Sequence, residues 1–409
     1  MIARVRRLYR EAYRGLPREL WLLAAATMIH RAGTMVLPFL SLYLTTQREF
    51  SIGVTGQIIG TYGLGSIIGS FVGGQLADRI GARRTMFLSL TISGVGYLIL
   101  SQLDDLWAIT IAVFFVSAVA EAFRPAVMAC FARFAPEDAT ARSFALLRLA
   151  ANIGVSIGPA VGGLIALYSY HWLFIVDAIT CWVAAIVLHI FLAGPRVHAE
   201  DRAQPDPNSI SPWTDGPFLA LLLIVVGIAS IFFQITSTFP LYLKEIRGFR
   251  EDMIGAVFAL NAVVIAIFEM LLMLWLNRFR KMRVIAFGAA LICIGFGLMP
   301  FSGSRPYILF TVLVWTLGEM ICLPYINALV AERAGRTHQG RYMGLYVSAF
   351  ASAFVFAPII GTQVYQRYGP DTLWFGIAVM ALPLAVGSLL LERHLSVVPA
   401  AKRTDEVAR

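Results

Sequence analysis

The chain has 409 residues, of which 58% are apolar and only 14% are charged, with a formal net charge of +9. Repeated apolar stretches of roughly 20 residues have the length of a membrane-spanning helix, which argues against a soluble globular protein. Arginine and lysine gather in alternate loops, so the positive charge indicates membrane topology and not nucleic-acid binding.

The sequence predicts an all-α membrane protein with twelve transmembrane helices and both termini in the cytoplasm. A basic amphipathic segment at residues 1–18 either lies on the inner membrane surface or is a solvated tail. A proline-rich linker at 194–216 separates two bundles of six helices, 19–193 and 217–392, and a cytoplasmic tail follows at 393–409. In chain order, the predicted helices lie near residues 20–45, 53–77, 85–103, 106–132, 143–168, 172–192, 217–243, 253–276, 284–301, 306–330, 342–365 and 372–391.

The two predicted bundles share landmarks at a constant offset of 199 residues. Parallel duplicated halves are typical of secondary transporters, in which the substrate site lies near the bilayer midplane where the halves meet. The sequence therefore predicts two repeats of the same orientation. The matching landmarks are Leu42-Tyr43-Leu44 with Leu241-Tyr242-Leu243, Pro125 with Pro324, Arg142 with Arg341, Pro159 with Pro358, and Gly162 with Gly361.

Two local patterns stand out in the first half. A charged turn between the second and third predicted helices contains Gly74, Asp78, Arg79, Gly81 and Arg83. Its carboxylate is suited to accept hydrogen bonds from the free amides that begin the eleventh helix, near residues 342–344. The fifth predicted helix carries a second pattern, which is either a packing face with a proline kink or a functional signature. That pattern consists of Gly154, Gly158, Pro159, Gly162 and Gly163.

Both patterns resemble the major facilitator superfamily, and within it the twelve-helix drug:proton antiporters. The turn is similar to the family signature G-x-x-x-D-R-x-G-R-R-R, with Ala82 where a basic residue is common. The fifth helix is similar to the antiporter signature G-x-x-x-G-P-x-x-G-G. This resemblance implies alternating access, with the turn as a conformational latch that holds the outward-open state. Phe114 and Phe115 stand where the fourth-helix signature usually has an arginine, and the second-half turn at 277–283 lacks the acid and the glycine.

Ionisable residues inside apolar helices are functional candidates, because they are costly unless paired or hydrated. Glu121 and Arg124 share a helix face, and form either a structural pair or a pair that takes up a proton when the arginine moves away. Arg31 either pairs with Glu121 or binds an anionic substrate group. Glu269 is either a second proton site or a partner of Arg148. The predicted proton-coupling residues are Glu121, Glu319 and Glu269, and the predicted charge partners or substrate contacts are Arg31, Arg124 and His30.

The remaining polar candidates have structural or substrate-lining interpretations. Asp177, about one turn inside the outer face, is predicted to bond the short outer loop at residues 170–172. Residues on the presumed cavity helices are predicted to line the substrate path, although their periodicity fits a lipid-facing surface equally well. These are Met35, Phe39, Met128, Phe233, Gln234, Trp315 and Asn327. The four cysteines have neither disulfide nor metal spacing and are predicted to be packing residues.

Together these patterns predict a proton-coupled exporter of small amphipathic compounds, of the multidrug efflux type, that works by alternating access in a bacterial-type inner membrane. Its predicted partners are a small-molecule substrate, protons and the lipid bilayer, and it is expected to be a monomer without cofactor, metal or nucleic acid. The alternatives are a proton symporter for small peptides, zwitterions or organic anions, and a non-transporting membrane sensor or enzyme. For an enzyme, the sequence offers neither a phosphate-binding loop nor a nucleophile elbow.

Overall fold

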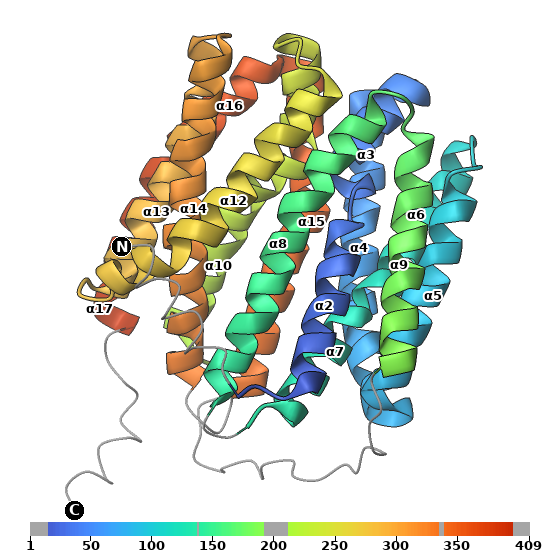
Figure 1. The fold of residues 1–409 in the computed structure, drawn as a ribbon. Helices are drawn as coiled ribbons and strands as arrows, with labels where there is room; N and C mark the ends of the chain where they lie inside the picture. The colour runs from blue at the N-terminus through green and yellow to red at the C-terminus, as the bar shows by residue number, and fades with distance from the viewer. Residues whose placement is uncertain (1–14, 137–138, 192–211, 335–338, 396–409) are drawn as a thin grey trace, which may run out of the picture. The chain divides into compact units, whose positions relative to one another are not determined.

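The computed structural model describes residues 15–136, 139–191, 212–334 and 339–395, and within these ranges the chain is helical without any strand (Figure 1). This confirms the predicted all-α class. The basic amphipathic segment, the linker and the C-terminal tail predicted from the sequence lie almost wholly outside the described residues.

The helices follow the predicted order along the chain. In the first half they are α2 (Arg18–Ala32), α3 (Val36–Leu42), η1 (Tyr43–Gln47), α4 (Ile52–Leu76), η2 (Ala77–Gly81), α5 (Ala82–Leu100), α6 (Leu106–Glu121), α7 (Phe123–Phe134), α8 (Thr140–Ala166) and α9 (His171–Phe191). In the second half they are α10 (Gly216–Phe232), η4 (Phe233–Thr236), α11 (Thr238–Leu241), η5 (Tyr242–Ile246), α12 (Glu251–Leu276), α13 (Lys281–Gly297), η6 (Met299–Phe301), α14 (Arg305–Ala334), α15 (Gln339–Tyr368), α16 (Pro370–Val379) and α17 (Ala381–Leu395).

In the described ranges, 10 helical stretches are long and apolar enough to cross a membrane. Each lies within a few residues of a predicted helix. Helices α4 and α5 occupy the second and third predicted positions but are not among those ten stretches. The total of twelve spans and the orientation of the termini therefore stay predictions.

Helix α4 packs closely on α6 through its glycines. A Cβ on Gly65 would lie 2.4 Å from the Phe114 carbonyl oxygen, and one on Gly69 would lie 2.0 Å from the Ala118 carbonyl oxygen. No side chain fits at these positions, because the two backbones are in contact. Small residues that allow such an approach are the usual means of helix association in lipid, where the hydrophobic effect gives no driving force.

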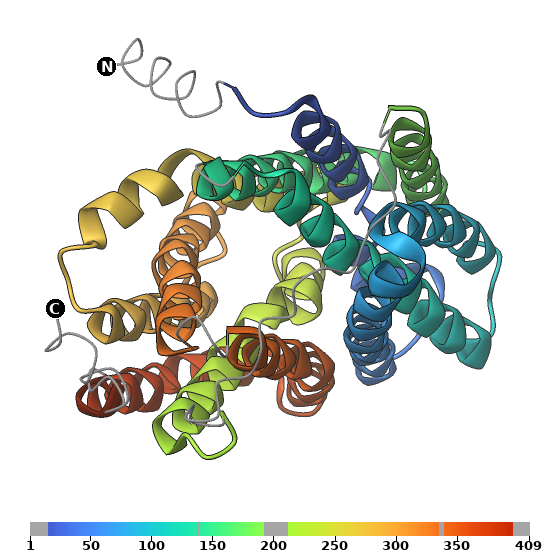
Figure 2. The same ribbon diagram turned by 90° about the horizontal axis from the view of Figure 1, so that it is seen from below.

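The helices group into two compact units. The first contains Met1–Ala199 together with Pro240–Ala266, and the second contains Glu200–Phe239 together with Ile267–Arg409. Pro240–Ala266 was expected in the second bundle, so the compact units differ from the predicted bundles in this segment. Within the first unit α2 packs on α8 and α5 packs on α9, while within the second unit α13 packs on α14 and α17, and α10 packs on α15 (Figures 1 and 2).

The repeated Leu-Tyr-Leu landmark has the same local geometry in both copies. Each copy runs into a π-helical turn, η1 or η5. Arg48 donates a hydrogen bond from Nε to the Tyr43 hydroxyl at 2.7 Å, and Arg247 donates one to the Tyr242 hydroxyl. Each guanidinium also lies over the ring of its tyrosine, 5.3 Å and 5.0 Å from the ring centroids. The constant sequence offset therefore corresponds to a repeated structure.

Candidate functional site

The first span is interrupted at residues 33–35, between α2 and α3. Gly33 lies so close to α9 that a Cβ there would be 1.7 Å from Thr180 Oγ1 and 2.6 Å from Thr180 Cβ. Only glycine fits this contact. Pro38 occupies the first turn of α3, where its missing N–H removes no helical hydrogen bond. The interruption therefore follows from the close packing of Gly33 on α9 and from the proline at the start of α3.

Asp177 of α9 binds two backbone amides at this interruption. Its carboxylate accepts hydrogen bonds from the Met35 amide at 3.0 and 3.2 Å and from the Val36 amide at 3.1 Å. The residue is only 1% exposed. The prediction that Asp177 bonds the outer loop is wrong, because the orphan amides at the start of α3 are donors that need a buried acceptor.

The first span of the second half is interrupted at the equivalent position, where the 3₁₀ turn η4 separates α10 from α11. Gln234, which follows Met35 by the repeat offset of 199, lies in this turn and is 4% exposed. Its Nε2 donates to the Ala357 carbonyl of α15 at 2.9 Å, and its Oε1 accepts from Thr238 Oγ1 at 2.8 Å. An amide side chain therefore holds this second interruption.

A repeated pair of glycines faces the two interruptions. A Cβ on Gly162 would lie 3.1 Å from Met35 Cβ, and a Cβ on Gly361 would lie 2.0 Å from Gln234 Oε1. The two halves thus bring equivalent helices, α8 and α15, against equivalent breaks. The contact is tighter in the second half.

The antiporter-type pattern of α8 forms one buried face. Its first two glycines contact the end of α2, since a Cβ on Gly154 would lie 2.6 Å from Arg31 Cβ and one on Gly158 would lie 3.0 Å from the Ala32 carbonyl oxygen. The pattern therefore packs directly beside one of the predicted charge partners, which its position in the sequence did not reveal.

The other end of the same face contacts the start of α12. A Cβ on Gly163 would lie 2.4 Å from the Glu251 carbonyl oxygen, and a Cβ on Gly255 would lie 2.3 Å from the Pro159 carbonyl oxygen. Here two backbones touch without intervening side chains. The five pattern residues thus connect the interrupted first span to α12 within the first compact unit.

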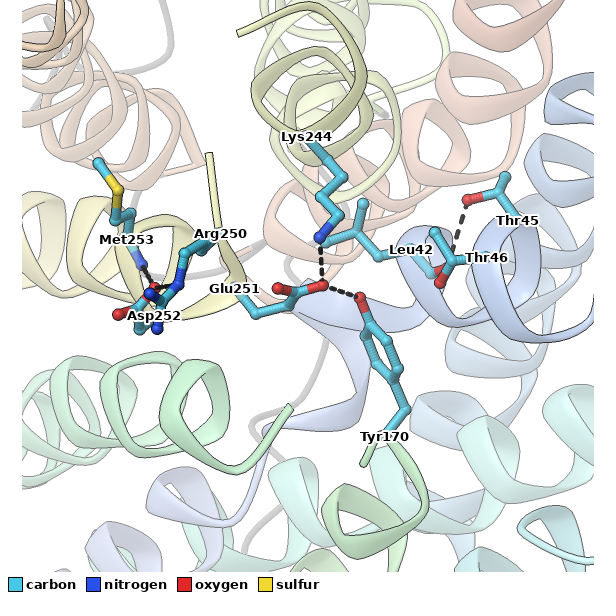
Figure 3. A network of polar contacts seen from close by, with 9 residues as sticks. All are labelled: Leu42, Thr45, Thr46, Tyr170, Lys244, Arg250, Glu251, Asp252 and Met253. Atoms are coloured by element: carbon cyan, nitrogen blue, oxygen red, sulfur yellow. Dashed lines mark hydrogen bonds and ion pairs between the residues drawn. The ribbon is translucent and has the colours of Figure 1, made fainter. Parts of the chain in front are cut away.

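A polar network lies beside this glycine contact (Figure 3). Glu251 Oε1 accepts hydrogen bonds from the Tyr170 hydroxyl at 2.9 Å and from Lys244 Nζ at 2.6 Å. Burial, and then the charge of Glu251, raise the pKa of Tyr170, so its hydroxyl remains a donor. This network is not apparent in the sequence, because its members belong to three separate segments.

Three ionisable residues of the first half lie near Tyr62 of α4. This buried residue lies within electrostatic reach of Glu121, Arg31 and Asp177. Within the described ranges, no ion pair joins Glu121 to Arg31 or to Arg124, which is exposed. The structure thus brings Arg31 and Glu121 to a common neighbour that sequence reasoning missed, without direct contact between their charged groups.

His30, predicted as a charge partner, is buried beside these residues. Its ring lies 4.9 Å from the Phe123 ring, between centroids, and its Nδ1 lies 3.7 Å from Cys181 Sγ. All four cysteines are buried and free, as expected for packing residues. In the second unit, Glu319 of α14 and Glu269 of α12 are both partly exposed.

The predicted latch forms a π-helical turn that ends at Gly81. Helix α4 passes into the π-helical turn η2, and α5 begins after Gly81, whose φ of 92° requires glycine. Arg83 donates to the His189 carbonyl at 2.7 Å, which ties the turn to the end of α9. Asp78 and Arg79 are exposed. The expected contact of Asp78 with the eleventh helix stays a prediction.

The predicted cavity residues have different environments. Met35, Phe39 and Gln234 are buried at or near the interruptions, while Met128 and Asn327 are exposed. Trp315 is 0% exposed and stacks on Phe296 at 5.3 Å between ring centroids, so it belongs to the core of the second unit.

Phe233, another predicted cavity residue, lies beside the second interruption in a group of aromatic rings. It stacks on Phe354 at 4.4 Å between ring centroids and contacts the edge of Phe350 at 5.2 Å. Its side chain is only partly buried. An aromatic surface of this kind suits apolar, flat ligands.

One buried ion pair in the second unit was not foreseen. Asp215 accepts two hydrogen bonds at 2.9 Å from Arg333 and one at 2.9 Å from the Tyr342 hydroxyl, and caps α10 through the Phe218 amide at 3.2 Å. Burial alone would raise the pKa of Asp215, but these hydrogen bonds outweigh burial and lower it. The network joins the ends of α10, α14 and α15.

Comparison with known sequences gives consistent matches along the chain. A sequence profile described as the Major Facilitator Superfamily matches residues 22–358 and 242–407. The tetracycline resistance protein, class C, of Escherichia coli is 25% identical over 362 residues, covering 85% of this chain and 86% of that protein. The multidrug resistance protein MdtH of Aeromonas hydrophila subsp. hydrophila is 23% identical over 347 residues, covering 84% of each. A Na(+), Li(+), K(+)/H(+) antiporter of Planococcus maritimus is 24% identical over 377 residues, covering 84% of this chain and 86% of that protein.

Solved structures share the architecture. A peptide transporter POT in complex with sulfate superposes with a TM-score of 0.78 at 16% identity, covering 94% of this chain and 96% of that chain. A variant of the nucleoside transporter NupG gives a TM-score of 0.78 at 13% identity, covering 91% and 100%. At such low identity these structures support the fold alone.

Proposed function

This chain belongs to the major facilitator superfamily of membrane transporters, and we propose that it is a proton-coupled exporter of small amphipathic compounds in an inner membrane. The observation that carries this proposal is the glycine-proline face of α8. Its five residues pack against the interrupted first span at one end and against α12 at the other. A pattern that resembles the antiporter signature thus lies beside Arg31, one of the predicted charge partners.

Close backbone contact makes this face suited to conformational change. Glycine contacts hold two helices together without interdigitated side chains, so small rotations of α8 against α2 meet little steric resistance. Pro159 removes one helical hydrogen bond within the same face, which favours bending there. Helix α8 is therefore the element that we expect to transmit movement between the first span and α12.

Proton coupling is assigned to the acids that lie within the spans. Glu121 and Arg31 share Tyr62 as a neighbour without forming an ion pair, so their interaction can change when α2 moves. Glu319 lies one residue from the repeat equivalent of Glu121, and we propose that one of these two acids exchanges its proton for substrate. Glu269 is a further candidate proton site, and Arg124 is a candidate charge partner of Glu121.

The relatives support export more than uptake. The curated relatives named above include a tetracycline resistance protein, a multidrug resistance protein and a cation/proton antiporter. The partly exposed aromatic group at Phe233 is compatible with flat, apolar compounds. We further propose that the protein works as a monomer, and that the turn from Gly74 to Arg83 acts as its latch.

Transport in proteoliposomes with an imposed pH gradient tests this proposal. Purified protein is reconstituted, compounds that raise its melting temperature serve as substrates, and uptake is followed with and without the gradient. We expect accumulation on the side from which protons leave. Movement of substrate and protons in the same direction would contradict antiport and favour the symport alternative. Absence of both gradient-driven transport and substrate counterflow would contradict a transport function.

A further inference from the structure

We propose that Asp177 is a further proton-binding residue of this transporter and that it positions the first span. In its ionised form the carboxylate holds the interruption between α2 and α3, and its protonation releases that interruption. The inference rests on the proposed proton coupling, because it adds Asp177 as a protonation site to Glu121 and Glu319. The sequence predicted only a structural role for this residue.

The hydrogen bonds of Asp177 make the hold on α3 depend on whether its carboxyl group is ionised. Its two oxygens accept hydrogen bonds of 3.0–3.2 Å from the Met35 and Val36 amides at the start of α3, and the Met35 amide is shared with the Gly33 carbonyl at 2.8 Å. Hydrogen bonds to a carboxylate are roughly twice as strong as those between neutral groups. A protonated carboxyl keeps one good acceptor and gains a donor that these amides cannot satisfy. Protonation therefore weakens the hold on α3 without removing any side chain.

The surroundings contain few charges that could take over this role. Helix α8 has no ionisable residue between Arg148 and its end at Ala166. Tyr62 of α4, Tyr97 of α5 and Cys181 of α9 itself lie within electrostatic reach of Asp177. Glu121 also acts on both tyrosines, Arg31 acts on Tyr62, and His30 lies beside Cys181. Asp177 is the carboxylate of this group that binds the amides of the interruption.

The interruption is directly coupled to Arg31. The Thr34 amide donates to the Arg31 carbonyl at 3.1 Å, and the Met35 amide, which Asp177 binds, also lies 2.8 Å from the Gly33 carbonyl. Only three residues thus separate the predicted charge partner, Arg31, from the Met35 amide that the carboxylate holds. Release of α3 changes the direction of the last turn of α2, and with it the position of the guanidinium relative to Glu121. Asp177 is a positioning residue in this sense.

The second half provides a natural control. Gln234 holds the equivalent interruption through an amide that does not titrate. The repeat equivalent of Asp177 is Gly376 in α16, so the second half has no acid at that place. Only the first interruption is therefore expected to respond to pH.

Hydrogen–deuterium exchange of the full-length protein in nanodiscs tests this inference. Protection is measured for the segments 33–37 and 233–237 at about pH 8 and about pH 5, after correction for intrinsic exchange rates. We expect protection of the first segment to fall by about tenfold at the lower pH, and that of the second to change by less than about twofold. In Asp177→Asn, which keeps an acceptor oxygen but cannot titrate, both segments should change by less than about twofold.

Two results would overturn the inference: equal protection of the first segment at both pH values in the wild type, or a tenfold change that persists in Asp177→Asn. If the variant does not fold, the wild-type profile of the two segments decides alone. A protein with intact gradient-driven transport but pH-independent protection contradicts only the role of Asp177. A protein without gradient-driven transport contradicts the proposed function, whatever its exchange profile.

Discussion

The span that begins each half is interrupted at an equivalent position of the repeat, but different chemistry holds the two interruptions. In the first half a carboxylate on α9 accepts hydrogen bonds from the backbone of the broken helix. In the second half an amide on the broken helix itself donates to the backbone of α15. The donor and acceptor roles of side chain and backbone are thus reversed between the halves.

This difference shows that a duplicated fold keeps its geometry more strictly than its side chains. The requirement is the same in both halves, since a break in a buried helix leaves backbone groups that need partners. Asp177 accepts from amides at the first break, while Gln234 donates to the Ser230 carbonyl of its own helix and to the Ala357 carbonyl of α15. Of these two side chains only the carboxylate can change its charge. The first half is therefore suited to respond to protons, while the second half is suited to remain fixed at its break.

The largest effect is expected for the acid of the second half. We expect Glu319→Gln to lower pH-driven transport by at least about 100-fold while substrate binding, measured by thermal shift, stays within about twofold. Glu121→Gln is the matched variant in the first half. Unchanged pH-driven transport in Glu319→Gln would remove this residue from the mechanism, and an equal loss in both variants would assign protons to both halves.

The buried ion pair of the second unit should contribute strongly to stability. Asp215→Asn removes the carboxylate that Arg333 binds, and we expect a loss of about 3 kcal/mol in the free energy of unfolding. Because the pKa of Asp215 is lowered in the folded state, its contribution is present above its ordinary value of 3.8 and is lost as the pH falls through the folded-state value. Melting in detergent at several pH values measures both effects.

The control for this variant is Asp252→Asn. Asp252 lies 3.5 Å from Arg250 in a much more exposed pair. Such a pair contributes roughly 0.5 kcal/mol or less. Equal destabilisation by the two substitutions would contradict the special role given to Asp215.

Adding a methyl group at each of the two equivalent glycines shows how closely α8 and α15 pack against the two interruptions. Gly361→Ala forces a Cβ to within 2.0 Å of Gln234 Oε1, whereas Gly162→Ala meets Met35 Cβ at 3.1 Å. We expect the free energy of unfolding to fall by about 2 kcal/mol in Gly361→Ala and by about 1 kcal/mol in Gly162→Ala, measured by melting in detergent. A second substitution, Gln234→Ala, should recover part of the loss in Gly361→Ala but none in Gly162→Ala.

The smallest effect concerns the turns after η1 and η5. Glu49 has a φ of 54° where the second half has Gly248 with a φ of 64°. A left-handed backbone is strained for glutamate but not for glycine. We expect Glu49→Gly to stabilise the protein by about 0.5 kcal/mol and Gly248→Ala to destabilise it by about 1 kcal/mol. Stabilisation by Gly248→Ala would show that the two turns are not equivalent.

Much of the fold was predictable from the sequence. The extents of the helices agree with the apolar stretches because a span must match the thickness of the bilayer. The constant offset predicted a repeat, and both copies of the Leu-Tyr-Leu landmark indeed form the same π-helical turn. These features depend on local composition and spacing, which are visible in the chain itself.

The candidate site was only partly predictable. Arg31, Glu121 and the α8 pattern were identified because charges, glycine and proline are conspicuous in apolar helices. The roles of Asp177 and Gln234 were not, since their hydrogen-bond partners lie 142 and 123 residues away in the chain. Trp315 was expected in a cavity wall but is buried, because helical periodicity does not separate a cavity from a core.

The all-α class, the positions of the ten apolar stretches, the repeat and the family follow from the sequence, because hydropathy and motif spacing are properties of the chain. Which side chains hold the broken spans is visible only in the folded protein. Backbone amides and carbonyls freed by a break accept any suitable partner that packing brings near, and packing between distant helices has no counterpart in local sequence.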